Sequence, residues 1–216
     1  MGKQKSKKNE QKSLKKQELI TGKVFNFCGC KWRVLEVLAD RALIISLIVF
    51  EKRPYNTQDT DVTWETCTLR KYLNGEFLQR FTAEEQSRII EVNITNNGNL
   101  WYETAGAINT DDKIFLFSLE EADWYFGNSG DYQNKCRKTF GNGKWDMDVN
   151  GRAFSNNHNF SRYALFNGYQ RWWWLRSPGS DRGRAAAVGS RGHVFVDGIP
   201  VGDNLGGVRP ALWLSL

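Results

Sequence analysis

The segment that decides the fold is RWWWLRSPGSDRGRAAAVGSRGHVFVDGIPVGDNLGGVRPALWLSL, residues 171–216. Two dense aromatic and apolar stretches, RWWWLR (171–176) and GVRPALWLSL (207–216), enclose a middle part that is small, Gly-rich and irregular. The outer stretches have the composition of strands, whereas the middle is typical of turns and exposed loops. Because alternate strand residues share a face, we expect Trp172 and Trp174 to lie on one side. Core packing is the favoured role of these rings over a platform that stacks sugars or bases.

The segments before this region predict strands first and helices next. KVFNFCGCKWRVLEV (23–37) and RALIISLIVF (41–50) are typical of strands, broken at Gly29 and at residues 39–40. TWETCTLRKYLNGEFLQRF (63–81) predicts a helix that ends at residues 74–75, where Asn and Gly follow each other.

Two capping boxes predict further helices. Thr82 with Glu85, and Ser118 with Glu121, have the three-residue spacing at which side chain and backbone cap each other. A strand over residues 114–117 is expected before the second of these helices. Strands at both ends, two or three short helices and long late loops together predict an α+β fold.

The chain divides into a basic tail and one domain. Residues 1–18 carry seven lysines and two glutamates, a net +5 of the chain's +6, so the body is nearly neutral. We therefore expect a disordered tail over residues 1–20, one domain over residues 21–216, and a polar surface insertion over residues 127–162. The neutral body argues against a nucleic-acid partner.

Membrane and secretory signals are missing from the sequence. No run of eighteen apolar residues is present, so we expect no membrane insertion. The first residues lack the apolar region of a signal peptide. The sequence leaves the localisation unknown, and a cytoplasmic and a virion-associated protein are both compatible with these observations.

Catalytic and metal-binding patterns are weak. The four cysteines form no C-x-x-C pair and the chain has two histidines, so a Cys/His metal centre is not expected. A calcium loop is suggested only by D-x-D-x-N-G, with Asp146, Asp148 and Asn150 as the candidate ligands. Its twelfth position is Asn157 instead of the usual Glu, and a polar turn is the favoured alternative. We therefore predict no enzyme activity, no required cofactor and no firm metal site.

WWWLRSPG (172–179), followed by GVRPALWL (207–214), resembles a C-type-lectin-fold family that is common in bacterial, phage and archaeal genomes. The resemblance runs from about Lys23 to Leu216 and includes the two N-terminal strand segments, the helix near residue 70 and DKIFLFSLEEA (112–122). It implies a C-type lectin fold, which is shared with formylglycine-generating enzymes. Members are often variable proteins of diversity-generating retroelements, in which a reverse transcriptase rewrites a C-terminal region by changing adenines.

The resemblance implies that only certain codons, and therefore only certain residue types, occur at the rewritten positions. The residues of this sequence can be checked against that set. The rewritten codons are typically AAC or AAT, and changes at their adenines cannot produce Lys, Glu, Gln, Met or Trp. These five types make up 46 of the 216 residues, yet none occurs from Ser180 to Gly207. A window of this length would lack all five by chance about once in a thousand cases. Gly-rich loops avoid these residues in any event, but the absence agrees with the motifs.

The resemblance implies a hypervariable, ligand-binding surface over about residues 177–207, displayed by a non-catalytic protein of the receptor or phage-attachment type. The implied ligand is a protein or glycan on another cell or particle. The regular apolar and glycine positions are expected to form the scaffold: Ala185, Ala186, Val188, Gly192, Val194, Gly198, Val201, Gly207 and Val208. The positions between them are the expected ligand-binding residues: Ser180, Asp181, Arg182, Gly183, Arg184, Gly189, Ser190, His193, Phe195, Asp197, Ile199, Pro200, Gly202, Asp203, Asn204 and Leu205.

Three alternatives stay open. An oxidase of the formylglycine-generating type would need a late pair of reactive cysteines, but no cysteine follows Cys136. A glycan-binding module that uses calcium in the C-type lectin manner would need E-P-N or Q-P-D with a later W-N-D, and both patterns are missing. Binding of nucleic acid or a membrane surface by the basic tail is the third alternative.

Overall fold

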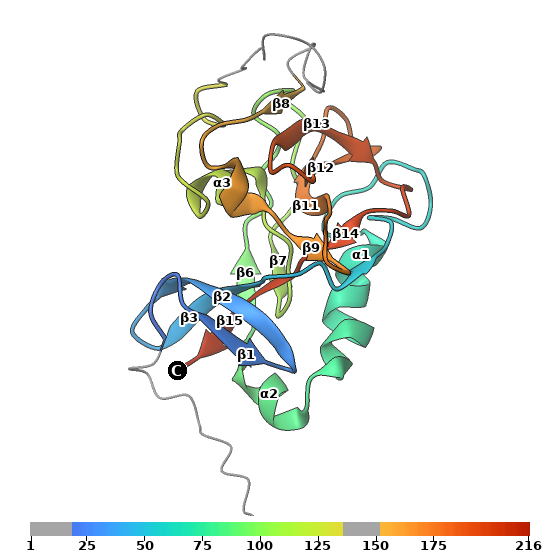
Figure 1. Cartoon of the computed structure of the whole chain (residues 1–216). Helices are drawn as coiled ribbons and strands as arrows, with labels where there is room; N and C mark the ends of the chain where they lie inside the picture. Colours follow the sequence, from blue (N-terminus) through green and yellow to red (C-terminus); the bar gives the residue numbers. More distant parts are fainter. Residues whose placement is uncertain (1–18, 136–151) are drawn as a thin grey trace, which may run out of the picture.

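Two sheets of mostly antiparallel strands form the frame of the protein, in a computed structural model that describes residues 19–135 and 152–216 (Figure 1). The predicted α+β class is confirmed, with short helices beside the sheets. The basic tail up to residue 18 and the calcium candidates Asp146, Asp148 and Asn150 lie outside the described residues. Leu19, which the sequence placed in the tail, is buried.

The first sheet joins the N-terminal strands to the C-terminal one. Its strand order is β1-β2-β3-β15-β5. The members are β1 (Val24–Phe27), β2 (Cys30–Val37), β3 (Arg41–Ser46), β15 (Ala211–Ser215) and β5 (Ile89–Ile90). Cys28 and Gly29 both have positive φ angles, of 51° and 68°, as a two-residue turn between antiparallel strands requires. The predicted breaks at Gly29 and at residues 39–40 are therefore confirmed.

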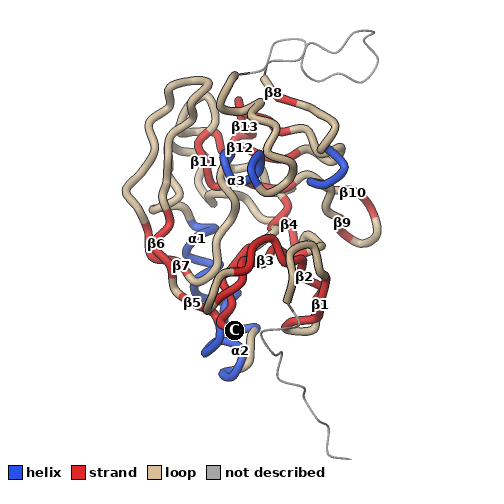
Figure 2. The backbone as a smooth tube through the Cα atoms, turned by 90° about the vertical axis from the view of Figure 1, so that its left-hand side faces the viewer, coloured by secondary structure: helices blue, strands red, loops and turns tan. Residues whose placement is uncertain are grey.

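The second sheet contains the segment that decides the fold. Its order is β4-β14-β11-β12-β13-β8, in which only β11 and β14 pair in parallel. The members are β4 (Glu51–Lys52), β14 (Gly207–Val208), β11 (Trp173–Pro178), β12 (Arg184–Val188), β13 (Val194–Pro200) and β8 (Ala153–Phe154). Figure 2 shows this sheet above the first.

The middle of the C-terminal segment is more regular than its composition indicated. β12 and β13 form a hairpin inside the second sheet, and three consecutive alanines of β12 are fully buried. Small side chains suit this position because the strand is covered on both faces. The prediction of an irregular segment throughout residues 177–207 was therefore wrong for these two strands, and only the turns around them are irregular.

Both capping boxes are confirmed by the structure. α2 (Ala83–Arg88) starts at Thr82 and α3 (Leu119–Trp124) starts at Ser118, each with reciprocal side-chain and backbone bonds to the glutamate three residues later. A short 3₁₀ helix, η4 (Asn159–Arg162), lies in the late loop. None of the helices in the described part is long and apolar enough to cross a membrane.

The first helical run does not end at Asn74 and Gly75 as predicted. α1 (Thr68–Tyr72) continues through the π-helical turn η2 (Leu73–Phe77) and the 3₁₀ turn η3 (Leu78–Arg80). The Asn74 side chain accepts hydrogen bonds from the backbone N–H groups of Lys113 and Ile114 and donates to the carbonyl of Ile114. These long-range bonds hold the helical path where the local sequence favours a stop.

The strand predicted over residues 114–117 was also wrong. The segment is extended and fully buried, but Phe115 makes only an isolated bridge, with Ala211. Phe117 accepts a hydrogen bond from the backbone N–H of Arg176. The segment thus connects β15 of one sheet with β11 of the other and has no continuous partner strand. The strand that does form nearby, β7 (Thr110–Asp112), pairs with β6 (Val92–Ile94).

The core is built around the tryptophans of the C-terminal segment. Trp173 and Trp174 are fully buried, whereas Trp172 is half-buried. The rings of Trp172 and Trp174 lie 4.8 Å apart between centroids and perpendicular to each other, which confirms that they share a face. The core interpretation of these rings therefore fits better than an exposed stacking platform.

Candidate functional site

The sixteen candidate ligand-binding positions fall at the two ends of the β12–β13 hairpin. Arg184 pairs with Pro200 at one end and Val188 with Val194 at the other. The first end carries most of the candidates: Ser180, Asp181, Arg182, Gly183, Arg184, Asp197, Ile199, Pro200, Gly202, Asp203, Asn204 and Leu205. The second end carries Gly189, Ser190, His193 and Phe195. The tertiary structure therefore splits the sequence-predicted set into a large group and a small one.

At the first end, two surface turns are joined through their backbones. Val201 N–H donates to the Gly183 carbonyl at 3.0 Å, and Ser180 N–H donates to the Asp197 carbonyl at 2.9 Å. Six residues on these turns are exposed: Asp181, Arg182, Pro200, Gly202, Asn204 and Leu205. Leu205 is 47 % exposed, which leaves its apolar side chain available for contact with a partner. We call these six residues the display set.

The backbone beneath the display set is held by a buried asparagine. Asn99, which is 1 % exposed, points its amide nitrogen at the carbonyls of Pro178 (3.0 Å), Gly179 (3.1 Å) and Val196 (2.6 Å). The hydroxyl of Thr104 donates to the carbonyls of Gly179 and Ser180. Because these bonds involve backbone carbonyls only, they are indifferent to the side chains displayed above them.

Arg184 and Asp197 were predicted to contact ligand, but their side chains are engaged within the hairpin. Arg184 donates to the carbonyls of Asp197 (3.0 Å) and Gly198 (2.6 Å), and its guanidinium lies 3.6 Å from the Asp197 carboxylate. Arg152 approaches the same carboxylate at 3.9 Å. These contacts fix the bulged register between β12 and β13, and both side chains are only partly exposed.

Phe195 requires a correction, because the sequence analysis placed it among the exposed contact residues. It is 8 % exposed and belongs to the hydrophobic core. β13 is an inner strand, so Phe195 is flanked by Ala187 on one side and Ala153 on the other. Its ring meets the imidazole of His193 edge-on at 4.4 Å. Gly189 is also buried, and a Cβ placed there would overlap the His193 ring.

The glycines of the C-terminal segment differ in how much space is available for an added Cβ atom. At Gly198 (φ +80°) an added Cβ would lie 2.7 Å from the Ala185 carbonyl oxygen, and at Gly192 and Gly207 it would overlap backbone atoms of Asn159 and Trp172. At Gly183 the nearest atom, 3.2 Å away, is a carboxylate oxygen of Asp181, and at Gly202 it is the Cβ of Asp59, also 3.2 Å away. Substitution is therefore most restricted at the first three positions, whereas the last two need a shift of only a few tenths of an ångström.

Two further loops, which the sequence analysis missed, complete the first end. Val62 N–H donates to the Arg182 carbonyl at 3.0 Å, and Asn56 N–H donates to the Val201 carbonyl at 3.0 Å. An open groove lies between residues 61–66, residues 106–108 and Arg182, and Ile108 at its rim is 68 % exposed. The polar run YNTQDTDVT (55–63) between a strand and a helix was the available signal, because long loops often carry binding residues.

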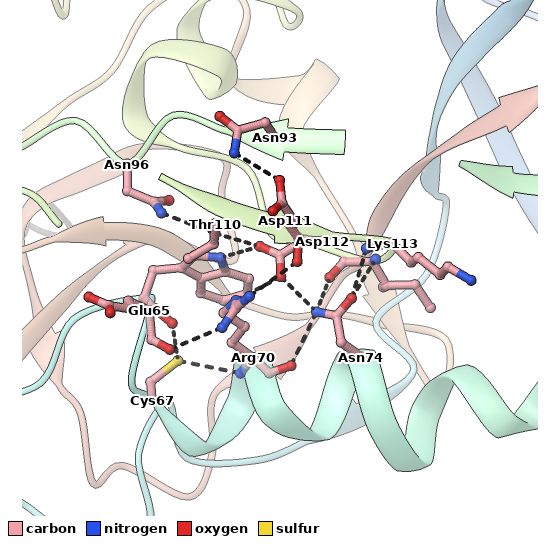
Figure 3. A network of polar contacts seen from close by, with 12 residues as sticks. Glu65, Cys67, Arg70, Asn74, Asn93, Asn96, Thr110, Asp111, Asp112 and Lys113 are labelled. Carbon is pink, nitrogen blue, oxygen red and sulfur yellow. Dashed lines mark hydrogen bonds and ion pairs between the residues drawn. The ribbon is translucent and has the colours of Figure 1, made fainter. Parts of the chain in front are cut away.

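A buried carboxylate fixes one of these loops to the rest of the fold (Figure 3). Asp112 is fully buried, and its two oxygens accept from Trp64 (2.9 Å), Thr110 (2.8 Å), Arg70 (2.7 Å) and Asn74 (3.1 Å). Trp64 lies in the loop that forms the groove wall, Arg70 lies on α1, and Thr110 lies on β7. The groove is therefore built on a rigid base.

The described residues offer little for nucleophilic or metal chemistry. Burial raises the pKa of the Cys67 thiol to about 12, so this cysteine stays protonated at neutral pH. Burial also raises the pKa of Cys28 and Cys30, which sit at the turn between β1 and β2. Within residues 19–135 and 152–216, no cluster of three His, Cys, Asp or Glu side chains is arranged to hold a metal ion.

Comparisons with known proteins identify one domain family. A family model described as "Domain of unknown function (DUF6273)" matches residues 39–216, which is most of the chain and all of the candidate site. No curated protein matches the sequence. No solved structure matches it either.

Proposed function

The chain belongs to the DUF6273 family, and we propose that it is a non-catalytic ligand-binding protein with a C-type lectin fold. In this proposal a diversity-generating retroelement varies the two surface turns at residues 180–184 and 199–205. The ligand is a protein or glycan on another cell or particle. The observation that carries the proposal is the separation between exposed side chains on these turns and the buried groups that hold their backbones.

That separation is what a hypervariable surface needs. The display set makes no contribution to the core, while Asn99 and the glycines at 179, 198, 206 and 207 sit where the chain packs against itself. Tyr55 donates to the Arg176 carbonyl at 2.9 Å, and Trp174 donates to the Arg53 carbonyl at 2.8 Å, which ties the turn region to the preceding loop. Exposed loop positions bury little area, so substitutions there change stability by only a few tenths of a kcal/mol, up to about 0.5 kcal/mol.

The arrangement of the sheets also favours the C-type lectin fold. The C-terminal strand β15 pairs antiparallel with β3, beside the N-terminal hairpin, so both ends of the domain share one sheet. The second sheet carries the long loops and the variable turns on the side away from that pairing. Two capped helices, α2 and α3, accompany the sheets.

Binding would depend on a few residues on a rigid frame, in the way that antibody loops bind. In the display set, Arg182 supplies a planar cation and Leu205 an exposed apolar group, and both side-chain types contribute well when a partner buries them. The rim formed by Val62 and residues 106–108, which lies outside the two turns proposed to vary, would border the same ligand.

The DNA beside the gene tests the retroelement directly. We expect a reverse transcriptase gene and a second, nearly identical copy of the coding segment for residues 177–207, differing from it at adenines. Gene copies from related strains should differ mainly at the display set. A neighbourhood without either element, or differences spread evenly over β11 and β15, would refute the retroelement and leave the fold to be tested separately.

The protein itself offers a second test. A quadruple variant, Asp181→Tyr, Arg182→Ser, Gly202→Asn and Asn204→Tyr, uses only residues that the rewritten codons can reach. We expect its melting temperature to stay within about 3 °C of the wild type. The control variant, Ala187→Tyr with Gly198→Asn, changes buried positions of the same segment and should fail to fold. Equal damage from both variants would contradict a display surface.

A further inference from the structure

The turn between β1 and β2 carries two cysteines that are separated by one glycine. Phe27 pairs with Cys30, so Cys28 and Gly29 are the two turn residues, with φ angles of 51° and 68°. Turns of this kind favour Asn, Asp or Gly at the first position, because the φ angle there is positive. Cysteine is therefore an unfavourable residue for the conformation of the turn, and a function of its side chain would explain its presence.

Both thiols are accessible from outside. Cys28 and Cys30 are free and half-buried, whereas Cys67 is fully buried. Free cysteine is among the most often buried residue types, so two partly exposed cysteines on one turn are unusual. The pair lies away from the display set. Figure 1 shows the β1–β2 hairpin beside α2, at the opposite end of the molecule from the β12–β13 hairpin.

The two cysteines lie on the same side of the hairpin. The Cys28 thiol donates to the carbonyl of Arg80 at 3.4 Å. Directly opposed residues of antiparallel strands share a face, so Cys30 lies on the face of Phe27, whose ring centroid is 5.6 Å from that of Phe81. Both cysteines therefore face the same neighbouring segment. The Cα atoms of residues two apart are separated by at most about 7 Å, and a tight turn shortens this distance, so one ion can contact both sulfur atoms.

The charges around the pair favour a cation. Burial raises the pKa of Cys28, the negative charges of Glu85 and of an ionised Cys30 raise it further, and Arg80 lowers it. The backbone N–H of Cys28 donates to the Glu85 carboxylate at 3.1 Å, so this carboxylate lies at the turn. Two thiolates beside a carboxylate repel one another, and a cation bound between the sulfur atoms would remove that repulsion.

The number of available ligands indicates which cation fits. A structural zinc site takes four protein ligands. Within residues 19–135 and 152–216, no third His, Cys, Asp or Glu side chain completes a metal site with this pair. Cu(I) is a soft ion that thiolates select, and two sulfur ligands in a linear arrangement satisfy it. A pair of cysteines alone is therefore a suitable site for Cu(I) and an incomplete one for zinc.

We propose that Cys28 and Cys30 bind one Cu(I) ion as a pair of thiolates. Each thiol releases its proton to solvent and each sulfur donates an electron pair to copper, so the ion keeps its oxidation state and the complex carries one negative charge. The Cu–S bond replaces the weak hydrogen bond from the Cys28 thiol to the Arg80 carbonyl. The site is independent of the proposed ligand-binding function, because it uses no residue of the display set or of the groove.

Competition for Cu(I) tests the site. The full chain, reduced and kept free of oxygen, is titrated with Cu(I) in the presence of bathocuproine disulfonate, whose absorbance reports the copper that the protein has not bound. We expect one equivalent of Cu(I) on the protein, and a roughly tenfold excess of Zn(II) should not displace it. The copper absorption edge should show the feature of linear, two-coordinate Cu(I).

Two variants separate copper binding from folding. Cys28→Asn places a favoured residue at the turn and removes one thiolate, so its melting temperature should be at least that of the wild type. Its affinity for Cu(I) should fall by more than about a hundredfold, because changes outside the ligands alone cost up to that much. Cys30→Ser should lower the affinity equally. Cys67→Ser, at a buried cysteine, is the control and should keep the wild-type affinity.

Several outcomes would overturn the proposal. The first is a wild-type chain that takes no Cu(I) from the competitor. Another is wild-type affinity in Cys28→Asn or Cys30→Ser. Loss of binding in a folded Cys67→Ser or Cys136→Ser chain would show that a different thiol is a ligand, and an absorption edge of three-coordinate copper would show that the pair does not suffice.

Discussion

Arg209 donates a hydrogen bond of 3.0 Å from Nη1 to the backbone carbonyl of Arg162, and both arginines are fully buried. Arg209 also donates from Nε to the carbonyl of Ser46 at 2.9 Å, and its guanidinium lies over the rings of both Phe126 and Trp173. Burial lowers the pKa of Arg209 to about 9. The residue thus connects the start of the C-terminal strand to β3 and to the late loop through neutral carbonyls.

Replacement of Arg209 by lysine should destabilise the protein strongly. An ammonium on a flexible stem cannot reach both carbonyls and cover both rings at once, so the Ser46 carbonyl or the Arg162 carbonyl, which also accepts from Trp173, loses a hydrogen bond. We expect the free energy of unfolding in urea to fall by about 3 kcal/mol. Arg182→Lys is the matched control, because Arg182 is exposed in the same segment, and it should change by less than about 0.5 kcal/mol. If both variants lower the free energy of unfolding equally, Arg209 does not connect the strands in the way described.

Gly198 and Gly202 should respond differently to alanine. Gly198 has a φ of +80° and lies against the Ala185 carbonyl, so Gly198→Ala combines backbone strain with overlap and should cost about 2 kcal/mol. An added Cβ at Gly202 would lie 3.2 Å from the Cβ of Asp59, a contact that a shift of a few tenths of an ångström relieves, so Gly202→Ala should cost less than about 0.5 kcal/mol. Thermal unfolding followed by circular dichroism gives both values. A larger loss at Gly202 would invert the proposed division between scaffold and display positions.

Asn99→Ala should loosen the turn beneath the display set. The change removes hydrogen bonds to three carbonyls, of which that of Gly179 keeps its bond from Thr104, for an expected loss of about 2 to 3 kcal/mol. Amide exchange at residues 179–184 should also become faster than in the wild type, while exchange in β2 and β3 keeps its rate at matched global stability. Asn204→Ala, at an exposed asparagine on the neighbouring turn, should change neither quantity.

Asp112→Asn should weaken the base of the groove. The amide retains one acceptor oxygen where the carboxylate has two, and it brings N–H groups toward donors such as Arg70 and Trp64. We expect a loss of about 2 to 3 kcal/mol in chemical unfolding. Asp111→Asn is the neighbouring control, because Asp111 is exposed and its carboxylate accepts only from Asn93 among the bonds of this network. If Asp112→Asn lowers the free energy of unfolding no more than Asp111→Asn does, Asp112 does not hold the base of the groove together.

Alkaline pH should destabilise the protein partly through Cys67. The pKa of its thiol is raised to about 12 in the folded protein from an ordinary value of 9.0, so the unfolded chain loses this proton first. The contribution to stability is present below pH 9 and is lost as the pH rises toward about 12. Cys67→Ser removes this titration, so stability between pH 9 and 11 should fall less steeply, by up to about 1.4 kcal/mol per pH unit. Parallel curves for variant and wild type would contradict this assignment.

The features that the sequence predicted correctly are those whose contacts join residues close together in the chain. The capping boxes at Thr82 and Ser118 were found correctly because all of their bonds lie within four residues. The strand segments of β1 and β2 and the break at Gly29 between them were found because a glycine adjoins two runs rich in apolar residues. The helical run past Asn74 was missed because the bonds that hold it come from residues about forty positions away.

Composition and spacing alone predicted the α+β class and the frame formed by RWWWLR and GVRPALWLSL, whereas the position of a display surface was implied by the family resemblance. Those properties depend on which residues are apolar, small or turn-forming, and the sequence states that directly. Only the tertiary structure decided which candidates reach solvent. Phe195 and Gly189 are buried and Arg184 is held by the carbonyls of β13, because neighbouring strands cover them. The groove beside residues 61–66 and a pocket lined by Asn96 and Arg176 are also formed by loops that are distant in the sequence. The packing of such loops depends on long-range contacts, which a local sequence pattern does not contain.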